Sequence, residues 1–173
     1  MTDIPIIADV PLVGEDEKGK ANIAVQEGMN RRIDEVFRLM RTNLTFMLCG
    51  DRHTILFTST TSGEGKTFNA ANLAVSYALM GKKVVLCGLD IRKPALGALF
   101  GLHDHKKGVS VLLSMKEVAE ADVMGQIQPS GVNQHLELLL AGPIPPNSTE
   151  LLARDSLRQV MSILKDSYDY VIL

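Results

Sequence analysis

The residues best suited to chemistry in this chain of 173 residues form the run Ser62-Gly63-Glu64-Gly65-Lys66-Thr67. Two glycines let the backbone turn so that successive N–H groups point at one anion. Lys66 can reach the β- and γ-phosphates of a nucleotide, and the Thr67 hydroxyl can bind the accompanying Mg²⁺. A helix that begins near Lys66 adds its positive N-terminal end. The run therefore predicts a phosphate-binding loop for a nucleoside triphosphate.

This loop departs from the usual pattern G-x-x-x-x-G-K-[ST] at its first position, where the chain has Thr60. A glycine-rich turn between a strand and a helix, without a ligand, is the alternative interpretation. The apolar run 54–58 and the Ala- and Leu-rich run 68–80 favour the loop, because the motif requires a strand before it and a helix after it. The predicted nucleotide-binding residues are Ser62, Gly63, Glu64, Gly65, Lys66, Thr67 and Phe68.

A second polar set, Asp90 and Arg92, follows the apolar run 83–87. In open α/β sheets, groups after the carboxyl ends of strands converge on the ligand crevice. Asp90 is placed to hold Mg²⁺ or to act as a base, and Arg92 to face phosphate or to fix Asp90. The alternative is a strand end closed by solvated charges. With the loop nearby we favour a site in which Lys66, Asp90 and Arg92 are catalytic and Thr67 and Asp90 bind Mg²⁺.

The elements that must position these residues alternate between strands and helices. Strands are expected at 54–58, 83–87, 136–140 and 170–173. Longer helices are expected at 31–48, 66–80 and 148–167, with short helical pieces over 94–127 broken at Gly101, Gly108 and Gly125. Continuous apolar strands between helices are typical of a parallel sheet with helices on both faces. The predicted class is α/β, of the P-loop NTPase type, with an extended arm over 1–28 and one domain over 29–173.

Composition excludes several classes of partner and site. A net charge of −2 argues against general attraction to nucleic acid. Cys49 and Cys87 are isolated in apolar surroundings, which predicts buried thiols rather than a disulfide framework or a metal site. No run approaches the roughly 20 apolar residues of a membrane span, and the N-terminus lacks a signal-peptide pattern.

Glu35, Arg38 and Arg41 recur at three-residue steps in the predicted helix 31–48, so they share one broad side. Spacing alone favours a solvated helix face on which Glu35 pairs with Arg38. The segment 141–147 follows the third predicted strand and is rich in proline. It is expected to form a rigid loop at the edge of the sheet that carries the nucleotide. The sequence does not require this loop to contact the nucleotide.

Taken in order, four segments of the chain resemble the cytoplasmic domain of bacterial tyrosine kinases, the P-loop kinases of capsule and exopolysaccharide export. They are residues 35–44, 58–67, 84–94 and 141–152, and the likeness covers nearly the whole chain. The resemblance implies an autophosphorylating protein-tyrosine kinase that uses ATP and Mg²⁺. It assigns Gly63, Gly65, Lys66 and Thr67 to the phosphates and Mg²⁺, and Asp90 to the metal and catalytic centre.

The resemblance also implies partners and a location. Glu35, Arg38 and Arg41 match the family's E-x-x-R-x-x-R helix, which packs between subunits of a ring, so it implies a homo-oligomer and reverses the interpretation from spacing alone. It further implies two partners, which are a membrane-spanning activator or polysaccharide chain-length domain, fused or separate, and a phosphotyrosine phosphatase. Nucleic acid is not expected as a partner. The expected location is the cytoplasmic face of the plasma membrane.

The chain departs from the family pattern at two places. Gly88 stands where the acidic motif Asp-x-Asp-x-Arg has its first aspartate. The last residues, Val171-Ile172-Leu173, precede the position of an Asp-x-x-Pro motif and a tyrosine-rich tail. Residues 2–11 resemble the segment after the second membrane helix in fused versions. We therefore expect an inactive fragment, cut at both ends, whose sheet is truncated near the fourth strand.

Two other functions remain as alternatives. A partitioning or positioning ATPase of the related P-loop group carries a signature lysine early in its loop, and Thr61 at that position counts against it. A nucleotide-binding assembly module without turnover is favoured by Gly88 and by the missing Asp-x-x-Pro motif.

Overall fold

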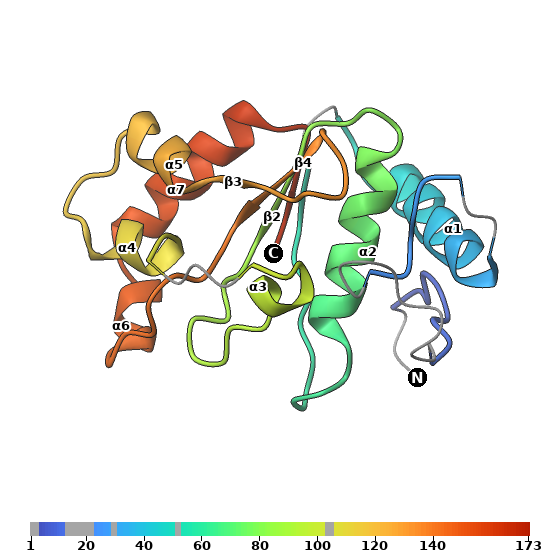
Figure 1. The fold of residues 1–173 in the computed structure, drawn as a ribbon, viewed down its shortest axis with the longest axis horizontal. Helices are drawn as coiled ribbons and strands as arrows, with labels where there is room; N and C mark the ends of the chain where they lie inside the picture. Colours follow the sequence, from blue (N-terminus) through green and yellow to red (C-terminus); the bar gives the residue numbers. More distant parts are fainter. Residues whose placement is uncertain (1–3, 13–22, 29–30, 51–52, 103–105) are drawn as a thin grey trace.

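The computed structural model of the chain describes residues 4–12, 23–28, 31–50, 53–102 and 106–173. Within these residues, one five-stranded sheet lies between two groups of helices (Figure 1). The strands are β1 (His53–Ile55), β2 (Val84–Cys87), β3 (Gln128–Pro129), β4 (Leu136–Leu139) and β5 (Tyr170–Ile172). The helices are α1 (Arg32–Met47), α2 (Lys66–Ala78), α3 (Leu96–Leu99), α4 (Val109–Ser114), α5 (Glu120–Gln126), α6 (Ser148–Leu152) and α7 (Asp155–Ser167). The predicted α/β class is confirmed.

The strand order in the sheet is β1-β5-β2-β4-β3, and the first four strands in that order run parallel. The last strand along the chain, β5, therefore lies between β1 and β2. Strand β3, which was not predicted, pairs antiparallel with β4 at the edge of the sheet. Two residues are too short for a periodicity, and Pro129 has no N–H for a second neighbour, which suits an edge.

Strand β2 shows why the sheet has two cores. Its alternate residues Val84 and Leu86 join the cluster that contains α1 and α2, whereas Val85 and Cys87 join the cluster of α4 to α7. All four are buried, so the strand is apolar throughout rather than alternating. The prediction that helices cover both faces is confirmed.

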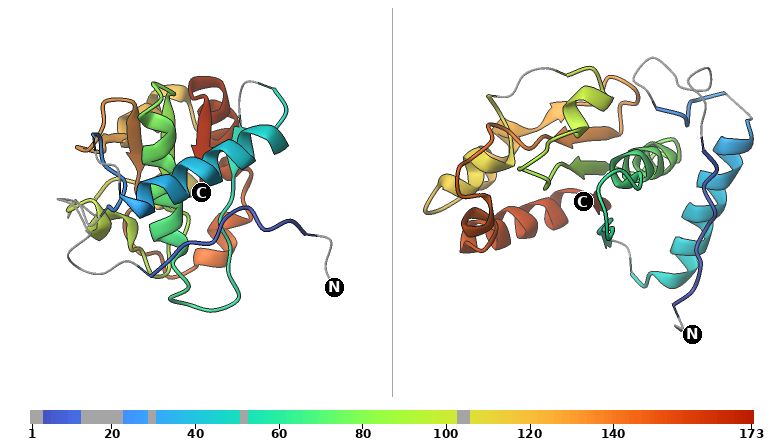
Figure 2. Two further views of the ribbon diagram at one scale, coloured as in Figure 1. Left: turned by 90° about the vertical axis from the view of Figure 1, so that its right-hand side faces the viewer. Right: turned by 90° about the horizontal axis from the view of Figure 1, so that it is seen from below.

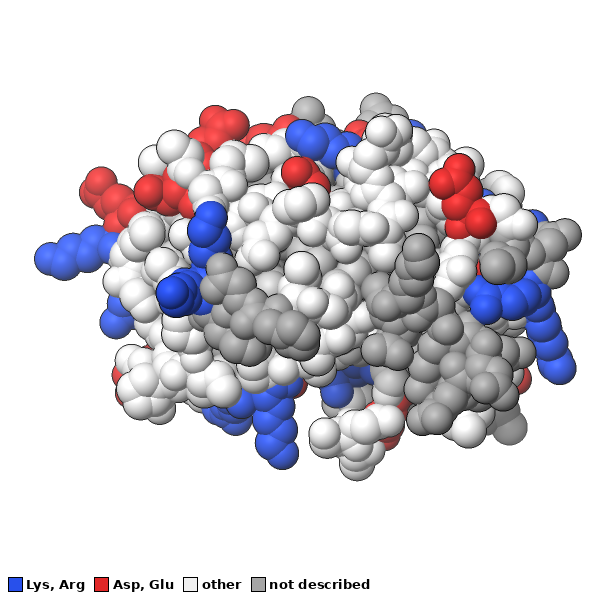
Figure 3. Space-filling view, viewed as in Figure 1, with Lys and Arg blue, Asp and Glu red and all other residues white. Residues whose placement is uncertain are grey.

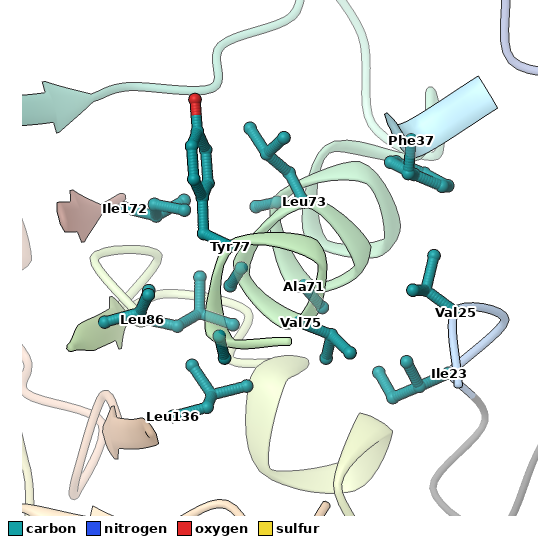
Figure 4. Packing of buried hydrophobic residues seen from close by; sticks show 14 of the residues in the cluster. Ile23, Val25, Phe37, Ala71, Leu73, Val75, Tyr77, Leu86, Leu136 and Ile172 are labelled. Atoms are coloured by element: carbon teal, nitrogen blue, oxygen red, sulfur yellow. The ribbon is translucent and has the colours of Figure 1, made fainter. Parts of the chain in front are cut away.

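Helix α2, which carries the end of the phosphate loop, is enclosed on several sides. Every residue from Ala70 to Ala78 is buried. In Figure 4, α2 stands between Leu86 and Leu136 of the sheet on one side and Phe37 of α1 on the other. The rings of Tyr77 and Tyr170 stack with centroids 3.8 Å apart. The residues that follow the loop are thus held firmly against the sheet.

The expected arm over residues 1–28 is described in two parts. Residues 4–12 run alongside α1 (Figure 2), and the Asn43 side chain donates a hydrogen bond to the carbonyl of Ile7. Residues 23–25 are buried in the main core. The N–H groups of Ala24 and Val25 each donate to Asn72 Oδ1 at 2.8 Å, so this part of the arm belongs to the packed domain.

Three local predictions were wrong. The single helix expected over 148–167 is two helices, because Arg154 is extended and Ser156 Oγ donates to the Leu113 carbonyl, which anchors the start of α7 on α4. Gly125 lies inside α5 instead of breaking it. Cys87 is buried as expected, but Cys49 is exposed, because it follows the last turn of α1.

Among the described helices, none combines the length and apolarity needed to cross a bilayer. Basic and acidic side chains both occur around the rim of the face in Figure 3, and its centre is largely uncharged.

Candidate nucleotide-binding site

The phosphate loop turns at two glycines with positive φ, 93° at Gly63 and 86° at Gly65. Residues other than glycine pay a steric penalty in this left-handed region. Gly65 is also the residue before α2, and its carbonyl accepts the N–H of Asn69. The first N–H groups of α2 have no acceptor within the helix, so they are available to an anion at its start.

Lys66 and Thr67 begin α2 at one wall of a cavity that Asp90 also lines. Lys66 Nζ donates to Ser59 Oγ at 2.7 Å, which holds the ammonium group over the loop. Ser59 was not singled out in the sequence, although hydroxyl residues crowd the segment 58–62. The arrangement brings together the two predicted metal ligands and the predicted phosphate-binding lysine.

Glu64 explains how the loop accommodates a residue other than glycine at position 60. The N–H and hydroxyl of Thr60 donate hydrogen bonds to the Glu64 carboxylate at 3.2 and 3.0 Å, and the Thr61 hydroxyl donates to the same carboxylate at 2.6 Å. These hydrogen bonds, that of Thr61 foremost, lower the pKa of Glu64 to about 2. The ionised carboxylate closes a small ring of contacts over residues 60–64, and Thr60 takes part in it.

Asp90 and Arg92 are both exposed, and they do not form an ion pair with each other. Asp90 Oδ1 accepts the N–H of Lys93 at 2.9 Å and that of Arg92 at 3.3 Å, so it stabilises its own turn. The Arg92 guanidinium donates to the Thr149 hydroxyl of α6. Arg92 therefore ties the turn after β2 to α6, and its predicted contact with phosphate stays a prediction.

Gly88 occupies a tight position at the end of β2. Its N–H donates to the Leu139 carbonyl at 2.9 Å. A Cβ atom here would lie 3.2 Å from the Ala141 nitrogen and 3.5 Å from Leu96 Cδ2. Any side chain at this position, including a carboxylate, requires the backbone at Ala141, in the loop after β4, to shift by a few tenths of an ångström, whereas Leu96 lies at an ordinary contact distance.

The other predicted nucleotide-binding residues divide between loop and core. Ser62 is exposed in the loop. The partly exposed Phe68 ring packs edge-on against Phe37, with centroids 6.1 Å apart, and it does not line the cavity. Ala141 and Gly142, in the proline-rich segment, line the same cavity as Lys66, which confirms that this loop lies at the predicted edge.

The charged motif of α1 lies on another side of α2. Glu35 and Arg38 form an exposed ion pair at 2.6 Å. Arg41 Nη1 donates to the Ser76 carbonyl and hydroxyl, at 2.6 and 3.0 Å. Burial lowers the pKa of Arg41. One arginine of the motif is thus bound within the chain, and the other is at the surface.

The predicted magnesium site has few protein ligands. Among the described residues, no three of His, Cys, Asp and Glu gather closely enough to hold a metal ion. Mg²⁺ usually keeps several waters and binds through one or two protein oxygens together with substrate phosphates. The Thr67 hydroxyl and the Asp90 carboxylate on one cavity fit that donor set.

Comparisons with known proteins identify the family of the chain. Residues 55–165 match the CobQ/CobB/MinD/ParA nucleotide binding domain family. The chain is 39% identical to tyrosine-protein kinase YwqD of Bacillus subtilis over 140 residues, which are 80% of this chain and 56% of YwqD. The chain belongs to the bacterial tyrosine kinases of capsule and exopolysaccharide biosynthesis. The matched residues 55–165 of this nucleotide-binding domain family include the predicted phosphate-binding loop over residues 62–67.

Two further relatives define the extent of the likeness. The chain is 32% identical to the putative tyrosine-protein kinase CapB of Staphylococcus aureus over 142 residues, which are 82% of this chain and 60% of CapB. The crystal structure of the chimerical protein CapA2B2 superposes with a TM-score of 0.80 at 32% identity, over 97% of this chain and 69% of that one. The chain thus spans less than two thirds of the curated relatives YwqD and CapB.

Proposed function

We propose that the intact protein is an ATP-dependent protein-tyrosine kinase that phosphorylates itself and regulates capsule or exopolysaccharide polymerisation and export. The observation that carries the proposal is the cavity shared by the P-loop residues Lys66 and Thr67 and by Asp90 of the turn after β2. Phosphoryl transfer is catalysed largely by positioning and by neutralising charge, and these residue types suit both tasks.

Each residue has a distinct role in this mechanism. Lys66 neutralises the terminal phosphates, and Thr67 and Asp90 orient Mg²⁺. Bound Mg²⁺ supplies further positive charge against the transferred phosphoryl group. A tyrosine hydroxyl has a pKa of about 10, so a nearby carboxylate such as Asp90 assists its deprotonation. The hydrogen bonds to Asp90 Oδ1 hold its turn in place.

The variant Lys66→Met tests this site directly. We expect ATP affinity and phosphotyrosine formation both to fall by at least tenfold, because the variant removes the cation while keeping the aliphatic stem. Isothermal titration calorimetry and antiphosphotyrosine blotting, on the protein extended past Leu173, measure the two quantities. The exposed Lys116→Met is the matched control. Unchanged ATP affinity in Lys66→Met contradicts the assigned site.

We further propose that the intact protein forms a ring through α1. It works at the inner face of the membrane with a membrane-spanning activator, which is fused or separate. A phosphotyrosine phosphatase dephosphorylates it. The exposed Glu35–Arg38 pair supports the ring, because it leaves charged groups at the surface of α1. The putative tyrosine-protein kinase of Klebsiella pneumoniae is matched over only 21% of its own length, so the rest of that protein leaves room for fused domains.

Gly88 favours a second candidate, a nucleotide-binding assembly module without turnover. Gly88 leaves Asp90 as the single carboxylate of the motif, and a Cβ atom at position 88 would lie 3.2 Å from the Ala141 nitrogen, so a side chain there is crowded. Measuring ATP binding and phosphotyrosine formation separately distinguishes the two functions. Tight binding without transfer in the extended protein selects the assembly module.

A further inference from the structure

Residues 23–25 of the arm lie against α2 in the way that a bound peptide lies against its receptor. All three are buried in the main core, although the described residues 23–28 belong to no helix or strand. In Figure 4, the side chains of Ile23 and Val25 lie on the side of α2 that carries Val75. Since no strand pairs with this segment, its buried main-chain groups need other partners.

Side chains from two neighbouring parts of the fold supply these partners. Asn72 Oδ1 of α2 accepts the N–H groups of Ala24 and Val25, both at 2.8 Å. The guanidinium of Arg31, the residue before α1, donates to the Ala24 carbonyl. The segment is thus fixed by side chains alone, so it can detach locally while the sheet stays intact.

Asn72 connects the segment to the start of α2. Its Nδ2 donates to the Phe68 carbonyl at 2.8 Å. Phe68 follows Lys66 and Thr67 in the first turn of α2, where the free N–H groups are available to phosphate. The first turn of a helix frays unless other groups hold it. The Asn72 amide therefore holds the phosphate-binding turn with one end and the arm with the other.

Detachment of the segment changes the surroundings of the Asn72 amide. The residue is fully buried, so its oxygen would lose both donors in a place that water does not reach. An unsatisfied buried acceptor is costly, and the amide must turn to find a new donor. Turning takes Nδ2 away from the Phe68 carbonyl and leaves the first turn of α2 less well held.

We propose that Asn72 is a positioning residue that couples the seating of residues 23–25 to nucleotide binding at the P-loop. The proposal rests on the ATP binding of the proposed function but not on phosphoryl transfer. With the segment seated, the first turn of α2 is already ordered, so the nucleotide binds at a lower entropic cost. Coupling of this kind is reciprocal, so bound nucleotide also favours the seated segment.

Hydrogen exchange of the Ala24 and Val25 amides in the full chain tests the coupling without requiring turnover. A saturating non-hydrolysable ATP analogue with Mg²⁺ should slow both amides about tenfold, a usual size for coupling between two sites. The Val85 amide of the buried strand β2 reports global unfolding. Without nucleotide, the two arm amides should exchange faster than Val85, because they open locally.

A matched pair of variants separates the coupling from a general loss of stability. Val25 and Val160 are 5% and 2% exposed, and Val160 lies in α7 in the other core cluster. Val25→Ala and Val160→Ala should lower the free energy of unfolding in urea by similar amounts. Only Val25→Ala should weaken ATP binding, by about threefold in calorimetry, because its segment is seated for less of the time.

Several results overturn the coupling. They are arm amides that exchange as slowly as Val85 without nucleotide, arm amides that the ATP analogue does not slow, and ATP affinities that stay unchanged or fall equally in the two variants. An original chain that binds no ATP overturns both the coupling and the proposed function. If both expected effects occur but the protein extended past Leu173 forms no phosphotyrosine, the coupling is supported and only the kinase function is rejected.

Discussion

The P-loop and the charged motif of α1 are both short spaced patterns, but their contacts reach very different distances along the chain. In the loop, Glu64 bonds to Thr60 and Thr61, and Lys66 bonds to Ser59, seven residues away. In α1, Arg41 bonds to the carbonyl of Ser76, 35 residues away. A motif whose contacts are local can be interpreted from its own residues, whereas the role of a helix face depends on what packs against it.

The two regions also differ in burial. Glu64 and its threonine partners are exposed. The partners of the second region lie on the side of α2 that faces α1, where Asn72 and Ser76 are fully buried. Asn72 accepts hydrogen bonds from the arm, and Ser76 accepts one from Arg41 of α1. Changes on the buried side should therefore lower global stability, and changes in the loop should mainly alter ligand binding.

The largest expected effect tests the buried side. Asn72→Ala leaves the buried N–H groups of Ala24 and Val25 without their acceptor, at a cost of about 1–3 kcal/mol for each unsatisfied group. We expect the free energy of unfolding, measured with urea, to fall by about 2–6 kcal/mol. The matched control Asn43→Ala, which loses one bond to Ile7 in the less buried arm, should cost about 1 kcal/mol or less. Equal losses in the two variants would contradict this reasoning.

The next effect separates the two arginines of α1. Arg41→Ala removes hydrogen bonds from a charged donor to Ser76 and should lower stability by about 1.5–3 kcal/mol. Arg38→Ala breaks an exposed pair with Glu35 and should cost about 0.5 kcal/mol or less. Urea unfolding measures both variants.

The same two variants sharpen the proposal of a ring. On a sizing column, Arg38→Ala should dissociate oligomers of the intact protein while leaving its fold unchanged. If Arg38→Ala assembles normally, the exposed part of the motif has no role at the interface, and the ring through α1 is rejected.

In the loop, Gly65→Ala should weaken ATP binding roughly tenfold, because the free loop of the variant relaxes out of the left-handed region and its return on binding costs about 1–2 kcal/mol. Calorimetric titration with ATP measures the effect, and the melting temperature should change little. Gly125→Ala in α5 is the control, since nothing lies within 4 Å of its added Cβ and alanine favours a helix. A large loss of stability in Gly65→Ala would remove the contrast between the two regions.

The smallest effect concerns pH. Because the folded pKa of Glu64, about 2, lies below its ordinary value of 4.5, its stabilising contribution is complete above pH 4.5 and is lost as the pH falls toward 2. A ¹³C NMR titration of the Glu64 carboxyl should show a midpoint near 2. Thr61→Val should raise that midpoint, and Thr42→Val in α1 should not. A midpoint near 4.5 in the original chain would show that the hydrogen bonds to Glu64 do not form.

Most of the sheet was predictable because its strands are continuous apolar runs. The four parallel strands were placed within a few residues of their observed ends, and β3 was missed because two residues carry no periodicity. The break between α6 and α7 depends on the contact of Ser156 with Leu113, 43 residues away, so no local pattern marks it. The burial of residues 23–25 likewise depends on Asn72.

The sequence by itself determined the α/β class and the P-loop, because these follow from local backbone requirements and from apolar runs that any sheet of this class must bury. The family followed from the resemblance of four spaced segments to those of bacterial tyrosine kinases. Only the tertiary structure decided that Arg41 is bound to Ser76, that Arg92 reaches Thr149, and that an apolar cavity adjoins Lys66. The physical reason is that a side chain's partner depends on which distant element packs beside it. That information lies in the whole fold rather than in the spacing of a motif.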